Sequence, residues 1–290
     1  MPTRPTIVLI LLGWALAAAG LLRRDILPDL WTTPPPDLRS IARAEQDDAP
    51  TEWDLSVADD DALRNLRPVG RAVTETRRSA DGDTILRSKV NFDSIGLLRG
   101  TPFDPKLGDD HREGHIEVHN TCAIDASGNL RRLDVAVRPR GEAAPIMTID
   151  AHPVGRKIEV TTRTPYPWLN ASRTFDYEPR HLIRSGVGPI DRLPGLQVGQ
   201  RWDTEVLSPL TGRVEPVRTE VTGKHSIQWN NKLVPTLEVV QHLSPIKARS
   251  WVGLDGLVLR QEIPLGIVRL ILDRVPPKTR DDAAGGTATP

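Results

Sequence analysis

The stretch "SWVGLDGLVLRQE", residues 250–262, places an Asp-Gly pair between two apolar runs. Asp and Gly tolerate the backbone angles of a tight turn, so the pattern predicts a hairpin that turns at Asp255-Gly256. The predicted cross-strand pairs are Val252–Leu259 and Leu254–Leu257 on an inward face, with Trp251–Arg260 and Arg249–Glu262 on the other face. Every position then has a structural role. We therefore interpret the stretch as scaffold and not as part of an active site.

Similar turn signals recur along the chain. The further pairs are Asp81-Gly82, Gly128-Asn129, Val154-Gly155, Thr211-Gly212 and Asn230-Asn231. Alternating apolar and polar segments lie between them, as in "HIEVHNTCAIDASGNLRRLDVAV", residues 115–137. Helical periodicity is almost absent. The sequence therefore predicts a mainly β fold in which successive hairpins build an antiparallel sheet.

The composition excludes several classes of function. Among 290 residues, 38 basic side chains balance 38 acidic ones, so no overall field favours nucleic acid. A single cysteine, Cys122, rules out a disulfide within the chain. No glycine-rich phosphate loop and no Gly-x-Ser-x-Gly elbow is present. We expect no enzymatic activity and no cofactor.

The two ends differ from the middle. Residues 6–22, "TIVLILLGWALAAAGLL", carry no charge and are flanked by Arg4, Arg23 and Arg24. Such a run directs a chain to the membrane, so residues 1–24 are expected to be a signal anchor or a cleaved signal peptide. Residues 25–50 include "TTPPPD" and predict a proline-rich stalk. Residues 51–275 form the β domain, and residues 276–290 predict a disordered tail.

Three segments carry a resemblance. They are "RTFDYEPRHLI" (173–183), "GPIDRLPGLQVGQRWDTEVLSPLTGRVEPVRTEV" (188–221) and "SWVGLDGLVLRQEIPLGIVRLIL" (250–272). Their order resembles the β domain that precedes bacterial transglutaminase-like domains, and it is similar to lipoprotein-carrier-like (LolA/LolB-like) half-barrels. The resemblance implies a strongly curved half-barrel sheet, with a helix plugging its open side and a concave face that holds acyl chains. No Cys/His pattern for transglutaminase activity matches.

A histidine-rich stretch is the sharpest candidate for metal chemistry. His111, His115 and His119 lie among carboxylates in "DDHREGHIEVH", residues 109–119, and imidazoles beside carboxylates can hold zinc. Along a straight strand, however, residues four apart are separated by about 13 Å. The alternative is an exposed polar strand face.

An aromatic cluster is the candidate for ligand binding. Tyr166, Trp168, Phe175 and Tyr177 lie in "PYPWLNASRTFDY", residues 165–177. Such residues can line the mouth of a ligand site, or they can anchor a core and cover a sheet edge.

These observations lead to one functional hypothesis with alternatives. We expect a non-catalytic protein of the bacterial cell envelope, either anchored in the inner membrane with its β domain in the periplasm or secreted after cleavage. The β domain would bind an apolar ligand, such as a lipid, or a partner protein. The alternatives are a structural adaptor with a filled sheet interior and a metal-binding protein that uses the histidine-rich strand.

Overall fold

A computed structural model describes residues 49–58, 66–92, 115–177, 184–185, 188–208, 213–243, 246–265 and 268–277. The predicted membrane segment (1–24), nearly all of the stalk, the Thr211-Gly212 turn, His111 and most of the tail lie outside these residues. Within the described ranges, no helix combines the length and apolar character needed to cross a membrane.

Fifteen strands form one continuous sheet, so the mainly β, antiparallel prediction is confirmed. The strands are β1 (Thr51–Ala58), β2 (Leu66–Arg78), β3 (Thr84–Phe92), β4 (Ile116–Ile124), β5 (Leu130–Pro139), β6 (Met147–Val154), β7 (Lys157–Arg163), β8 (Ala171–Asp176), β9 (Arg184–Ser185), β10 (Arg201–Ser208), β11 (Arg213–Trp229), β12 (Lys232–Leu243), β13 (Ile246–Gly253), β14 (Val258–Leu265) and β15 (Val268–Arg274). One 3₁₀ turn, η3 (Pro167–Leu169), lies between β7 and β8.

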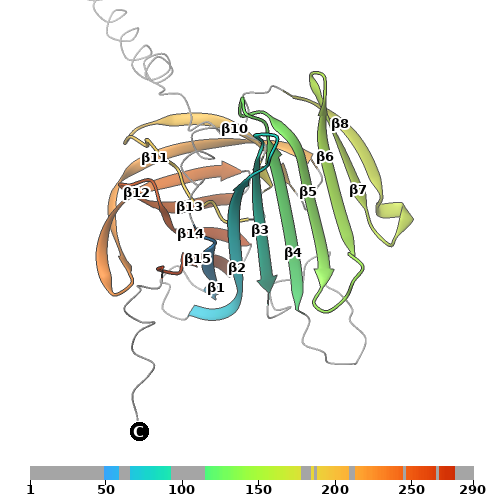
Figure 1. Ribbon diagram of the computed structural model, residues 1–290. Helices are drawn as coiled ribbons and strands as arrows, with labels where there is room; N and C mark the ends of the chain where they lie inside the picture. The colour runs from blue at the N-terminus through green and yellow to red at the C-terminus, as the bar shows by residue number, and fades with distance from the viewer. Residues whose placement is uncertain are drawn as a thin grey trace, which may run out of the picture.

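The first and last long strands meet in the middle of the sheet. The order is β8-β7-β6-β5-β4-β3-β2-β1-β15-β14-β13-β12-β11-β10-β9, so β1 pairs with both β2 and β15. All pairs are antiparallel except β9 with β10. Figure 1 shows β2–β8 as one half and β10–β15 as the other, with the strands of the two halves running in crossed directions. The sheet curls strongly, and its two terminal strands, β8 and β9, do not pair with each other.

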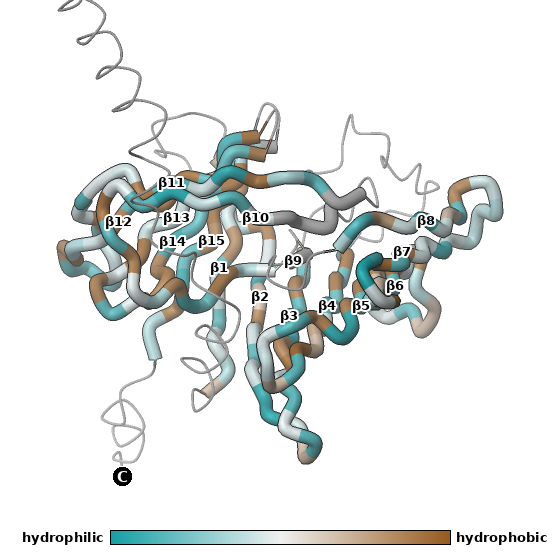
Figure 2. The backbone as a smooth tube through the Cα atoms, turned by 90° about the horizontal axis from the view of Figure 1, so that it is seen from above, coloured by the Kyte–Doolittle hydropathy of each residue, from teal (hydrophilic) through white to brown (hydrophobic). Residues whose placement is uncertain are grey.

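Alternation of apolar residues sets the inner face of this sheet. On β1 the side chains of Trp53, Leu55 and Val57 are buried, and Glu52, Asp54 and Ser56 between them are more exposed. On β4 the side chains of Val118 and Cys122 are buried. A single apolar cluster extends through both halves (Figure 2 shows the hydropathy along the chain), since residues from β1 to β15 contribute to it.

The hairpin of residues 250–262 forms, but with a different turn. The outer pairs Arg249–Glu262 and Trp251–Arg260 are confirmed. The two inner pairs are wrong, because the register shifts after Trp251 and Val252 faces Val258.

The reason for this shift is a three-residue loop. Gly253 N donates to Leu257 O (2.7 Å), Gly256 N donates to Gly253 O (2.9 Å), and Gly256 has a φ of +83°. A turn followed by a left-handed glycine forms a bulge that matches the twist of the strands. Leu254 therefore projects outward with 68 % of its surface exposed.

The other turn signals mostly mark hairpins as predicted. The pairs Asp81-Gly82, Gly128-Asn129 and Asn230-Asn231 join consecutive antiparallel strands. At the β6–β7 turn, Val154 pairs with Lys157, so the turn residues are Gly155 and Arg156, one position later than predicted.

Replacing Gly256 by Val should lower the free energy of unfolding by about 1–3 kcal/mol. A β-branched residue resists the positive φ, and its Cβ would lie 3.0 Å from Pro194 Cα. Gly82→Val is the matched control, because Gly82 has the same φ of +83° but no atom within 4 Å of the added Cβ. Urea denaturation should show the larger loss for Gly256→Val. Equal losses would mean that close packing against Pro194 contributes nothing.

Candidate functional site

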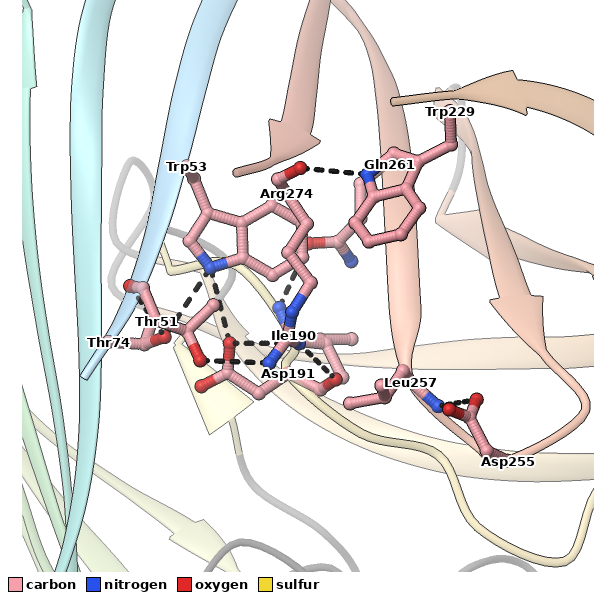
Figure 3. Close-up of polar contacts among 10 residues, drawn as sticks. All are labelled: Thr51, Trp53, Thr74, Ile190, Asp191, Trp229, Asp255, Leu257, Gln261 and Arg274. Carbon is pink, nitrogen blue, oxygen red and sulfur yellow. Dashed lines mark hydrogen bonds and ion pairs between the residues drawn. The ribbon is translucent and has the colours of Figure 1, made fainter. Parts of the chain in front are cut away.

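An extended segment, residues 188–193, lies against the inner side of the sheet, and we call it the inner segment (Figure 3). Leu193 N donates to Gly256 O (2.8 Å), and Arg192 forms a β-bridge with Leu257. At its other end, a Cβ added to Gly188 would lie 2.8 Å from Ser88 Oγ on β3. The inner segment therefore contacts both halves of the sheet.

A buried polar cluster holds the inner segment at the β1–β15 seam. We call it the clasp; it comprises Thr51, Trp53, Thr74, Asp191 and Arg274. Trp53 Nε1 donates to Asp191 Oδ1 (3.2 Å), and Arg274 Nη1 donates to Asp191 O (3.1 Å). Arg274 Nη2 donates to Thr51 Oγ1 (2.9 Å), and its guanidinium lies 5.7 Å from the Trp53 ring centre. These contacts join residues up to 223 positions apart.

The electrostatics of the clasp make it costly to disrupt. The side chains of Asp191 and Arg274 are only 11 % and 10 % exposed, and Asp191 Oδ1 lies 3.9 Å from Arg274 Nη1. Removing one member of a buried ion pair leaves the other charge without compensation in a medium of low dielectric. The geometry therefore supports structural fixation of the inner segment.

Three further hydrogen bonds extend the clasp along β14. Ile190 N donates to the Gln261 side chain (2.9 Å), and Gln261 Nε2 donates to Ser250 Oγ (3.3 Å). Val258 N donates to Asp191 O (3.0 Å). The inner segment is thus bonded to the same hairpin whose sequence predicted the fold.

The space beside the inner segment is small. A cleft of about 50 Å³ lies among residues that include Thr74, Ser88, Gly188 and Asp191. A cleft of this size holds water, whereas ligand sites usually measure several hundred Å³. The helix expected to plug the open side is absent from the described ranges, where the extended inner segment takes that position.

The four predicted aromatic residues are not brought together. Trp168 and Tyr166 are 77 % and 60 % exposed at the β7–β8 connection, with ring centres 6.1 Å apart. Tyr177 is buried, and its hydroxyl accepts a bond from Leu130 N (3.1 Å). Phe175 packs against the core. The four residues therefore do not form a common ligand mouth. Phe175 and Tyr177 anchor the core, and Tyr166 and Trp168 form an exposed pair.

The described part of the histidine-rich stretch forms polar contacts with neighbouring side chains and not a cluster of metal ligands. His119 Nε2 lies 3.1 Å from Glu117 Oε2, and Lys89 Nζ lies 3.4 Å from the same oxygen. The hydrogen bond from His119 and the charge of Lys89 lower the pKa of Glu117. His115 lies just before β4. In the ranges with described coordinates, no three His, Cys, Asp or Glu side chains are placed to share a metal ion.

A charged network covers the outer face of β5–β7. Arg132 Nη2 lies 2.8 Å from Asp134 and 2.7 Å from Asp150, and His152 Nδ1 lies 3.1 Å from Asp150. Burial raises the pKa of Asp134. Burial also acts to raise the pKa of Asp150, but hydrogen bonds with Asp134 and His152 outweigh this effect, so the pKa of Asp150 is lowered. An open hollow of about 390 Å³ lies here. Because the network is solvated, its ion pairs add little stability.

Sequence reasoning missed the clasp. The signal that could have found it is the single carboxylate in "GPIDRLPG", residues 188–195, which also holds two prolines and the apolar residues Ile190 and Leu193. An acidic residue in such a short apolar stretch, with no turn pattern of its own, indicates a buried carboxylate that needs a partner.

Comparisons with known proteins assign no family. No family model matches the chain, and no curated protein is significantly similar to it. Among solved structures, the chain is similar to a β-barrel-like protein of the domain of unknown function DUF1849 from Brucella abortus, with 13 % identity, a TM-score of 0.48, and coverage of 78 % of this chain and 94 % of that one. A DUF1089 family protein from Pseudomonas aeruginosa gives 15 % identity, a TM-score of 0.31, and coverage of 65 % and 87 %. Neither likeness indicates an activity.

Replacing Asp191 by Ala should lower the free energy of unfolding by about 3–5 kcal/mol, because Arg274 would remain buried without its carboxylate. Asp203→Ala is the control, since Asp203 pairs with Arg218 at the surface (side chains 69 % and 73 % exposed) and should cost at most about 1 kcal/mol. Urea denaturation followed by tryptophan fluorescence measures both. In the Asp191→Ala background, Arg274→Met should recover part of the loss. Equal costs for Asp191→Ala and Asp203→Ala would refute the role of the clasp.

Proposed function

We propose that this chain is a non-catalytic protein of the bacterial cell envelope whose β domain binds a partner protein. The observation that supports this proposal best is the inner segment, which the clasp fixes where a carrier would hold its ligand. Because the adjoining cleft is about 50 Å³, an apolar ligand has little room there. Of the two hypotheses, partner binding at the surface is therefore favoured over apolar ligand binding inside the sheet.

The open edge of β8 is the proposed place of contact. No described strand pairs with the outer side of β8, and Ser172, Arg173 and Thr174 are exposed. Such an edge can accept a strand from a partner through main-chain hydrogen bonds. Arg173 pairs with the buried Val160 across β7, which places a charge on the inner face of the edge strand. An inward charge of this kind opposes indiscriminate strand addition.

The envelope location rests on residues 6–22, whose uncharged run is bounded by arginines. We expect this segment to carry the β domain out of the cytoplasm. A reporter enzyme that is active only in the periplasm, fused after Pro277, should be active in cells. Activity of a cytoplasm-only reporter at the same point would overturn the proposed location.

The partner proposal predicts that the purified full chain carries no stoichiometric lipid. Organic extraction and mass spectrometry should find no acyl species at one equivalent. A photo-cross-linking amino acid in place of Thr174 should give one discrete protein adduct in cells, and the same amino acid in place of the exposed Leu233 on β12 should not. One equivalent of bound lipid would reinstate the carrier hypothesis, and the same adducts from both positions would refute the β8 contact.

A further inference from the structure

The connection between β7 and β8 exposes apolar side chains in one place. We call residues 164–170 the aromatic tip. Trp168, Tyr166 and Leu169 are 77 %, 60 % and 42 % exposed, and all three lie in or beside the η3 turn. The tip lies at the outer margin of the molecule, beside the terminal strand β8 (Figure 1). Large apolar side chains grouped on a surface usually mark a place of contact.

The polar groups of the tip backbone are largely satisfied within the tip. Pro165 and Pro167 have no N–H group, so residues 164–170 contain five. Four of the five are bonded inside the tip, with these distances: Thr164 N to Asn170 Oδ1 (2.6 Å), Tyr166 N to Thr164 Oγ1 (3.2 Å), Leu169 N to Tyr166 O (2.9 Å) and Asn170 N to Pro167 O (3.2 Å). Thr164 Oγ1 also donates to Tyr166 O (2.8 Å). A loop in water does not need these internal hydrogen bonds, since water can bond its backbone N–H groups.

The charged residues that flank the tip in sequence have one sign. Between Glu159 and Asp176 the chain contains Arg163 and Arg173 and no acidic residue. Neither arginine forms an ion pair with any residue that the structure describes. The tip therefore combines exposed aromatic and aliphatic side chains with flanking positive charge.

We propose that the aromatic tip inserts into the interfacial layer of an anionic lipid bilayer. Trp and Tyr suit this layer because an apolar ring carries a polar group, and arginines at its margin are attracted to anionic headgroups. The internal hydrogen bonds favour lipid over a protein partner. A protein surface can supply bonding partners to a loop, whereas the acyl region just below the interfacial layer cannot, so a loop whose apolar side chains reach that boundary is stabilised by satisfying its own backbone. This inference does not depend on the proposed partner binding at β8.

The test places an environment-sensitive fluorophore on the tip of the full chain. Trp168→Cys is labelled, and Leu233→Cys, which is 75 % exposed beside the β11–β12 turn, is the matched control. The native thiol of Cys122 is buried, and the unchanged chain measures its background labelling. Each labelled chain is mixed with phosphatidylcholine vesicles, with or without phosphatidylglycerol and lipid-borne quenchers at shallow or deep positions. Because residues 6–22 could bind vesicles by themselves, only vesicle-bound chains are compared.

The proposal expects a blue shift and several-fold quenching by the shallow quencher at position 168, and no quenching at position 233. Arg163→Gln with Arg173→Gln should remove the preference for phosphatidylglycerol. Equal signals at positions 168 and 233 would overturn the proposal. A blue shift at position 168 that requires added periplasmic protein and no lipid would also overturn it and would assign the tip to a protein partner.

Discussion

The buried contact of the Asp191 carboxylate with the Trp53 indole is the interaction on which the rest of the structure depends. Trp53 lies on β1 and pairs in register with Arg274 on β15, at the point where the two halves of the sheet join. The Arg274 guanidinium donates a hydrogen bond to the main-chain oxygen of Asp191, which lies 83 positions away in sequence. A seam between strands that lie at opposite ends of a long chain segment is entropically unfavourable to close. A third element bonded to both strands of the seam is therefore an effective way to stabilise it.

The same contact determines which surfaces remain for function. Because the inner segment occupies the inner side of the sheet, the recognition proposed above uses the edge and the loops. The sheet order places β8 at one end of the sheet, and its connection to β7 exposes Trp168 and Tyr166. An edge strand that accepts a partner and an adjacent tip that enters the bilayer are compatible on one protein, since they use the main chain of β8 and the side chains of the turn.

The sequence predicts the local part of this fold well. Hairpins such as β13–β14 depend on turn chemistry and alternation within about a dozen residues, and the outer pairs Arg249–Glu262 and Trp251–Arg260 follow from them. The loop of three residues was missed because Asp-Gly is compatible with a two-residue turn and with a bulge that ends in a left-handed glycine. The setting of Asp191 in a short apolar stretch indicates a buried carboxylate, but its partners could not be predicted, because they lie 83 and 138 positions away. The four aromatic residues are near one another in sequence, but Tyr177 is buried and Trp168 is exposed, and no periodicity encodes that difference.

The central claim is that the inner segment is an integral part of the folded domain. Native-state hydrogen exchange tests it most directly, at the amides of Ile190, Leu193 and Val258. Each of these amides is the donor in a hydrogen bond between the inner segment and the sheet or its hairpin. The account predicts that these amides exchange only on global unfolding, with the same free energy of opening as amides of β1 and β15. Exchange of Ile190 and Leu193 at a much lower free energy, with β1 and β15 still protected, would contradict it. The inner segment would then be a flap that opens to admit a ligand.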